Sequence, residues 1–124
     1  MIVSYLPDAE THRLWPQIRA LLEPAAKFGS VEVECSNQVV WIAHEGGTIH
    51  AAATTLLYDN GSAELRLAGG HRHRDWAPQL SETVSAWARS AGATRLTMKG
   101  RRGWARYAHR LGWVAHGTIY EKEL

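Results

Sequence analysis

Cysteine is nearly absent from this sequence, since Cys35 is the single cysteine among 124 residues. No intrachain disulfide can form, and a lone cysteine is typical of a protein kept in a reducing compartment, where Cys35 is expected to be a half-buried structural residue. The sequence also lacks an apolar run of about 18 residues, and it lacks a basic amino-terminal segment followed by an apolar stretch. We therefore expect no membrane span, no secretion by that route and a cytoplasmic location.

Acidic residues are missing between Glu82 and Glu121. Lysine and arginine gather in the same stretch, at Arg89, Arg95, Lys99, Arg101, Arg102, Arg106 and Arg110. The net charge of +2 is small, so this uneven distribution is what indicates a positive surface. Such a surface suits an anionic ligand, a nucleic acid or an acidic protein partner, and it is also typical of a solvated basic face. The six tryptophans are a second feature, because tryptophan is enriched in cores and at interface anchors.

Apolar periodicity and turn residues predict alternating strands and helices. We expect strands at residues 2–6, 39–43, 48–58, 63–68, 94–98 and 113–120, and helices at 9–28, 76–91 and 104–111. Pro16 and Pro24 should divide or kink the first helix, and residues 30–38 should form a short strand or a loop. Strand 63–68 should place Leu65 and Leu67 on one face and Glu64 and Arg66 on the other.

The order of these elements, β-α-β-β-β-α-β-α-β, predicts an α+β fold in one domain, residues 1–124, with a mixed sheet of about six strands. The first half of the sheet should be antiparallel. Because a crossover helix joins strand 63–68 to strand 94–98, these two strands should pair in parallel.

The junction of strand 63–68 with helix 76–91 is the stretch Gly69-Gly70-His71-Arg72-His73-Arg74-Asp75-Trp76-Ala77-Pro78. A strand that leads into a helix N-terminus presents backbone N–H groups at the positive end of the helix dipole, where α/β proteins often hold phosphates. The basic side chains of this junction add to that preference. A metal site at His71, His73 and Asp75 is disfavoured, because no cysteine and no fourth ligand lie nearby.

The element order resembles the fold of the GNAT N-acetyltransferases over nearly the whole chain. Helix 76–91 followed by Ala93-Thr94-Arg95-Leu96 looks like the segment after the family's acetyl-CoA pyrophosphate loop. That loop has the motif Gln/Arg-x-x-Gly-x-Gly/Ala, which falls on residues 72–77, where Arg72 and Ala77 match. The resemblance implies acetyl-CoA as cofactor, with Arg72, Arg74 and Ala77 at its phosphates.

Three departures from the family pattern bear on activity. Asp75 stands where the motif has its central glycine, and we expect its carboxylate to cap the helix and repel phosphates. The tyrosine that protonates the leaving thiolate in many members falls on Ala108 within the Phe-Tyr-x-x-x-Gly-Phe ending, so Tyr107 should point into the core. Glu64 is the only carboxylate on the strand that often supplies the general base, and it is either that base or an exposed residue of a polar face.

A narrower resemblance lies in the segment Gly100-Arg101-Arg102-Gly103-Trp104-Ala105-Arg106, together with residues 111–113 and 120–124. These residues look like those of small GNAT-like proteins encoded among the structural genes of tailed bacteriophages. The resemblance implies a protein of the phage particle, made in the cytoplasm of the bacterial host, that contacts other virion proteins or a second copy of itself.

Three functions follow from these observations. The departures and the phage resemblance favour a non-catalytic virion protein that needs no cofactor and binds partners through His71, Arg72, His73, Arg74, Trp76, Arg101, Arg102, Arg106 and Arg110. The alternative is an active acetyl-CoA-dependent N-acetyltransferase in which Glu64, or a water, takes the proton from the substrate amine. A third function is nucleic-acid contact through the basic residues of 99–110.

Overall fold

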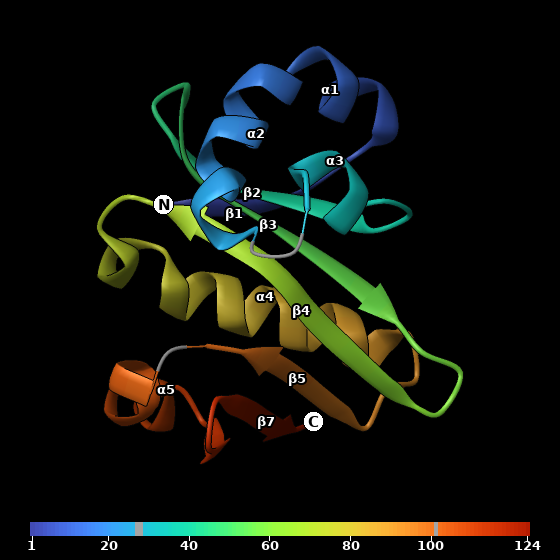
Figure 1. Ribbon diagram of the computed structural model, residues 1–124, viewed down its shortest axis with the longest axis vertical. Helices are drawn as coiled ribbons and strands as arrows, with labels where there is room; N and C mark the ends of the chain where they lie inside the picture. The colour runs from blue at the N-terminus through green and yellow to red at the C-terminus, as the bar shows by residue number, and fades with distance from the viewer. Residues whose placement is uncertain (27–28, 101) are drawn as a thin grey trace.

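The computed structural model describes residues 1–26, 29–100 and 102–124 (Figure 1). The first half of the chain contains β1 (Ile2–Leu6), α1 (Asp8–Arg13), α2 (Trp15–Leu22), the 3-10 helix η1 (Glu23–Ala25), α3 (Val31–Glu34), β2 (Val39–Glu45) and β3 (Thr48–Leu57). The second half contains β4 (Ser62–Gly70), the 3-10 helix η2 (His73–Asp75), α4 (Ala77–Ser90), β5 (Arg95–Lys99), the 3-10 helix η3 (Arg102–Trp104), α5 (Ala105–Arg110), β6 (Val114–His116) and β7 (Ile119–Glu123).

The strands form one seven-stranded sheet in the order β1-β2-β3-β4-β5-β7-β6. Its pairs are antiparallel except for β4 and β5, which are parallel because α4 carries the chain from the end of one to the start of the other. The predicted α+β fold and the parallel crossover are confirmed. The last expected strand is instead a hairpin of β6 and β7, whose turn includes Gly117 at φ +68°.

Helices cover the two faces of the sheet unequally. On one face α4 and α5 bury a large cluster that includes Leu65, Leu80, Leu96 and Trp113. On the other face α2 and α3 bury a smaller cluster around Ile18, Leu22 and Ile42, which sits on the β1–β4 half of the sheet. Figure 1 shows α1, α2 and α3 grouped together, with α4 crossing behind β4.

The first helical region is divided, as its prolines predict. Leu14 separates α1 from α2, Pro16 lies in the first turn of α2, and Pro24 lies in the following 3-10 helix. Segment 30–38 differs from the prediction, because residues 31–34 form the short helix α3. The Ser30 hydroxyl caps it by accepting a hydrogen bond from the Val33 N–H at 3.3 Å.

A β-bulge on β4 overturns the predicted alternation of that strand. Leu65 pairs with Thr55 and Leu67 pairs with Thr54, so that Arg66 is the extra residue. As a result Leu65 packs in the large cluster and Leu67 in the small one, on opposite faces of the sheet. The Thr54 hydroxyl supports the bulge by accepting a hydrogen bond from the Leu67 N–H at 3.2 Å.

Among the described residues, no helix is long and apolar enough to cross a membrane.

Candidate functional site

Strands β4 and β5 separate halfway along their length. Their parallel pairing runs from Ser62 with Arg95 to Leu65 with Met98, and it stops at the position of the Arg66 bulge. Beyond it β4 continues to Gly70 while β5 ends at Lys99. Because a bulge bends its strand and increases the local twist, it turns β4 away from β5, and Figure 1 shows the two strands diverging.

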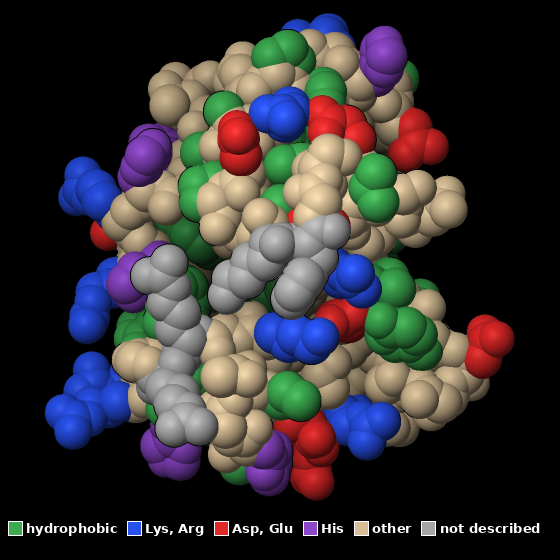
Figure 2. All heavy atoms as spheres, in the orientation of Figure 1, with side chains coloured by type: hydrophobic (Ala, Val, Ile, Leu, Met, Phe, Trp, Pro, Cys, Tyr) green, Lys and Arg blue, Asp and Glu red, His purple; other side chains and the backbone are tan. Residues whose placement is uncertain are grey.

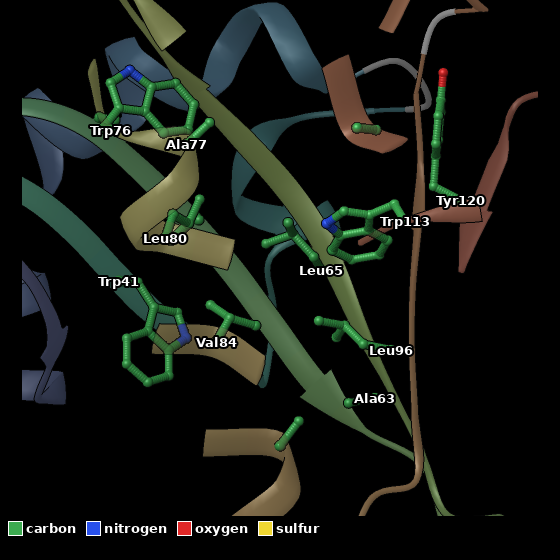
Figure 3. Close-up of a cluster of buried hydrophobic side chains, with 14 of the residues drawn as sticks. Trp41, Ala63, Leu65, Trp76, Ala77, Leu80, Val84, Leu96, Trp113 and Tyr120 are labelled. Atoms are coloured by element: carbon green, nitrogen blue, oxygen red, sulfur yellow. The ribbon is translucent and has the colours of Figure 1, made fainter. Parts of the chain in front are cut away.

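A cavity of about 50 Å³ lies where the two strands diverge. It is bounded by β4, β5, α4 and α5 and is lined mostly by apolar and aromatic side chains: Leu65, Ala68, Trp76, Ala77, Leu80, Ser81, Met98, Trp104, Tyr107, Ala108, Leu111 and Trp113. Figure 3 shows part of this wall, with Leu80 between Trp76 and Leu65, and with Trp113 beside Leu65. The Trp113 indole is itself satisfied, because its N–H donates to the Ser81 hydroxyl at 3.1 Å.

Tyr107 lines this cavity, and its hydroxyl is buried with no hydrogen-bond partner among the described residues. A buried hydroxyl without a partner costs about 1–3 kcal/mol, because it has lost its water and gained nothing in exchange. Such groups are rare in folded proteins and call for an explanation in function or in bound solvent. Tyr107 packs against the large cluster, as the sequence predicts, but its hydroxyl has no hydrogen-bond partner among the described residues.

The loop between β4 and α4 departs from the expected structure at Asp75. Trp76 occupies the N-cap position of α4, and no described side chain caps the helix. The Asp75 carboxylate lies instead 3.0 Å from the Arg72 guanidinium, in an ion pair whose side chains are 45% and 84% exposed. The prediction that Asp75 caps the helix is wrong, because the 3-10 turn of η2 places Asp75 one residue too early. The first N–H groups of α4, those of Ala77 and Gln79, keep no side-chain acceptor.

Two glycines hold the start of this loop against its neighbours. A Cβ at Gly69 would lie 2.0 Å from the Leu21 carbonyl oxygen of α2, and one at Gly70 would lie 2.5 Å from the His50 carbonyl oxygen of β3. Only residues without a side chain allow such close backbone approach. The end of β4 is thereby fixed where the loop begins.

The loop between β4 and α4 (the η2 loop) then packs against η3 and α5, on the far side of the split, which is the point where β4 and β5 diverge. The His73 ring stacks on Trp104 with centroids 5.2 Å apart and planes 22° apart, and it meets Tyr107 edge-on at 5.2 Å. The Arg74 guanidinium lies 5.1 Å from the centroid of the Tyr107 ring. These contacts join the loop after β4 to η3 and α5.

Trp76 is only 3% exposed, and its indole N–H donates to the His71 carbonyl oxygen at 2.9 Å. Its ring is therefore not available to a partner in this conformation of the loop. Arg72 and Arg74 are exposed, as is His71. All three were predicted to face a partner, and Arg72 and Arg74 also to face the cofactor phosphates.

The basic residues of α5 lie near the same edge of the molecule. Arg106 and Arg110 are exposed, Arg102 belongs to η3, and Arg101 lies outside the described residues. Figure 2 shows Lys and Arg side chains along the edge where Figure 1 places the start of α4 and α5. Trp104 and Tyr107 face the cavity and the η2 loop, so they do not form a stacking platform for nucleic-acid bases.

Glu64 lies on the sheet face opposite Ala63 and Leu65, away from the cavity. Its carboxylate accepts a hydrogen bond from the Tyr58 hydroxyl at 2.6 Å and lies 3.6 Å from the Arg66 guanidinium. The side chain is 14% exposed. The hydrogen bond to the Glu64 carboxylate raises the pKa of Tyr58, with burial as the second cause. The structure thus places Glu64 beside the split, one residue from the cavity-lining Leu65.

Two other kinds of site are not supported. Among the described residues, no group of three or more His, Cys, Asp or Glu side chains could hold a metal ion. Burial raises the pKa of the Cys35 thiol, which is the opposite of what an activated nucleophile needs. Cys35 is half-buried, as the sequence predicts.

The fold is that of the GNAT acetyltransferases. Tetrahymena GCN5 superposes with a TM-score of 0.78 at 11% identity, over 99% of this chain and 96% of the other. A GNAT family acetyltransferase from Elizabethkingia anophelis with acetyl-CoA bound gives 0.77 at 10% identity, and the aminoglycoside 6'-N-acetyltransferase from Enterococcus faecium gives 0.77 at 15%, each over 99% of this chain and 97% of the other.

Sequence comparison adds nothing to this likeness, because no family model and no curated protein match the chain. Identities this low show the fold alone. Nothing in the fold or in these comparisons concerns phage particles, so the virion location and the virion partners stay predictions.

Sequence reasoning missed two features of the site, the bulge at Arg66 and the hydroxyl of Tyr107, which is unpartnered in the described part of the chain. A bulge leaves only a faint signal, although the Thr54 hydroxyl on the neighbouring strand supports this one. The core position of Tyr107 was predictable, whereas the lack of a hydrogen-bond partner for its hydroxyl among the described residues leaves no signal in the sequence. In the structure both Tyr107 and Ala108 line the cavity.

Proposed function

We propose that this chain is an N-acetyltransferase that binds acetyl-CoA where β4 and β5 diverge. The observation that carries this proposal is Tyr107, which lines the cavity between the two strands and whose buried hydroxyl has no partner in the described part of the chain. A proton donor held at a mostly apolar cavity is what an acyl transfer needs when a thiolate leaves. The fold supports the proposal, since a GNAT acetyltransferase with acetyl-CoA bound has the same architecture.

The residues around the split fit the chemistry of acetyl-CoA. The N–H groups of Ala77 and Gln79 at the start of α4 suit phosphate oxygens, because no side chain of the described residues caps α4 and the helix dipole is positive there. Arg72 and Arg74 add exposed positive charge beside them. The mostly apolar cavity suits the pantetheine arm. When bound, acetyl-CoA supplies an acetyl thioester that an amine can attack.

Two groups of this chain would handle the protons of that reaction. Tyr107 would hold its proton inside the cavity and donate it there, and its burial keeps water from competing. Glu64, on the opposite face of β4, would accept the proton of the substrate amine directly or through a water. Tyr58 orients the Glu64 carboxylate through their 2.6 Å hydrogen bond. An amine acceptor would then approach from the face opposite the cavity.

Calorimetric titration with acetyl-CoA tests the proposal. We expect a dissociation constant in the micromolar range for the wild-type chain, weakened about 10- to 100-fold in Arg72→Ala, because one charge-assisted phosphate contact is worth about 1.5–3 kcal/mol. Arg110→Ala is the matched control, since it removes an exposed arginine from the far end of α5. Absence of binding at millimolar acetyl-CoA would overturn the proposal and favour the non-catalytic virion protein.

A further inference from the structure

The cavity at the split is too small for the cofactor arm in the conformation described. One water molecule needs about 10–15 Å³ of such space, so the volume of about 50 Å³ corresponds to roughly three to five water molecules. An acylated pantetheine arm is many times larger. If the proposed function holds, some element around the cavity must therefore move before acetyl-CoA can enter.

The η2 loop is the element that spans the split. It leaves the end of β4, and its His73 and Arg74 side chains lie on Trp104 and Tyr107, two residues of the cavity wall that belong to η3 and α5. His73 is the central contact, because its ring touches both aromatic rings at once. Separating these rings would separate the two sides of the cavity.

The η2 loop also has features of a segment that can change conformation. Arg72, Arg74 and Asp75 are exposed, so that little apolar surface resists their movement. Arg72 has φ +57° and ψ +60°, a left-handed conformation that a residue with a Cβ adopts at a cost, and returning it to an ordinary conformation would redirect the loop. The residues on either side are anchored, since the Trp76 indole holds the His71 carbonyl and Gly69 packs on α2.

We propose that residues Arg72–Asp75 form a gate over the acetyl-CoA site, and that the His73 ring, packed against Trp104 and Tyr107, is the latch that keeps it closed. This inference rests on the proposed function. Cofactor binding must break the latch, so the closed state lowers the apparent affinity by the fraction of molecules that are closed. Removing the latch should therefore strengthen binding, which is the opposite of what removing an ordinary binding residue does.

The test measures the affinity and the association rate of acetyl-CoA for the wild-type chain and three variants, by calorimetry and by stopped-flow tryptophan fluorescence. His73→Ala should bind roughly two- to tenfold tighter and associate faster, because an aromatic pair of this kind shifts the closed population by about that factor. His73→Phe keeps an aromatic ring and should behave like the wild type. His71→Ala removes a neighbouring exposed imidazole that touches neither ring, and it should leave both constants unchanged.

The results separate the gate from the proposed function. Wild-type binding with unchanged or weaker binding by His73→Ala would overturn the gate and leave the acetyl-CoA site standing. An equal increase in acetyl-CoA affinity in His73→Ala and His73→Phe would also overturn the gate, because the aromatic contact would then not be the latch. Failure of the wild type and of every variant to bind would overturn the proposed function itself. Circular dichroism and thermal unfolding of each variant confirm that it is folded.

Discussion

Replacing Tyr107 with phenylalanine should stabilise the protein and at the same time damage its activity. The substitution removes only the hydroxyl, which is buried and has no hydrogen-bond partner among the described residues. The ring and its contacts with His73 and Arg74 stay in place. If the Tyr107 hydroxyl serves catalysis and destabilises the fold, its removal should raise stability and lower activity.

The size of both effects follows from the burial of the hydroxyl. An unpartnered buried hydroxyl costs about 1–3 kcal/mol, so Tyr107→Phe should raise the free energy of unfolding by about 1 kcal/mol or more. For a chain of 124 residues the entropy of unfolding near the midpoint is about 0.26 kcal/mol/K, so each kcal/mol raises Tm by about 4 °C. Loss of a positioned proton donor should lower the turnover rate by about 10²-fold or more.

Thermal and denaturant unfolding measure the first effect, and release of the free thiol from acetyl-CoA in the presence of a panel of amines measures the second. Tyr5→Phe is the matched control, because Tyr5 is 54% exposed and loses a hydroxyl that water can solvate. The control should change stability by less than about 0.5 kcal/mol. A Tyr107→Phe variant that is less stable than the wild type, with unchanged turnover, would refute the reasoning, because the hydroxyl would then make a structural hydrogen bond.

Three further predictions concern the surroundings of the site. Gly69→Ala should destabilise the fold by about 3 kcal/mol or more, because its Cβ would lie 2.0 Å from a backbone oxygen of α2, whereas Gly103→Ala, with nothing within 4 Å, should be neutral in the same unfolding assay. Asp75→Asn should tighten acetyl-CoA binding in calorimetry, since it removes a negative charge beside the phosphates, and unchanged binding would place the phosphates elsewhere. The raised pKa of Tyr58 means that the folded chain holds that proton more tightly, so its contribution to stability is complete below pH about 10 and is lost as pH rises through the raised pKa. Unfolding midpoints of the wild type and Tyr58→Phe should therefore converge above that pH. A constant difference between the two midpoints at every pH would contradict this prediction.

The architecture was predictable because apolar periodicity and the positions of turn residues agree along most of the chain. The parallel crossover followed from a helical stripe between two β-prone runs, and α4 ends within one residue of the predicted end, just before Gly92 with its φ of +89°. The end of the sheet was less predictable, because residues 113–120 carry little apolar alternation and the turn between β6 and β7 depends on one glycine. Local patterns are strongest where one face of an element is buried.

The site was harder to predict because it depends on positions shifted by one residue. The Arg66 bulge exchanges the faces of Leu65 and Leu67, and the turn of η2 moves Asp75 away from the N-cap of α4. Both shifts are tertiary effects that leave composition and periodicity unchanged. The structure therefore removes capping by Asp75 as a reason for a non-catalytic protein, while the repulsion of phosphates by its carboxylate stays a prediction.

Amide hydrogen exchange with and without acetyl-CoA tests whether the cofactor binds where β4 and β5 diverge. We expect slower exchange at residues 66–70 of β4 and at the first turn of α4, with little change in α1 and α2. Unchanged exchange at saturating acetyl-CoA, or protection confined to other parts of the chain, would show that acetyl-CoA does not bind there.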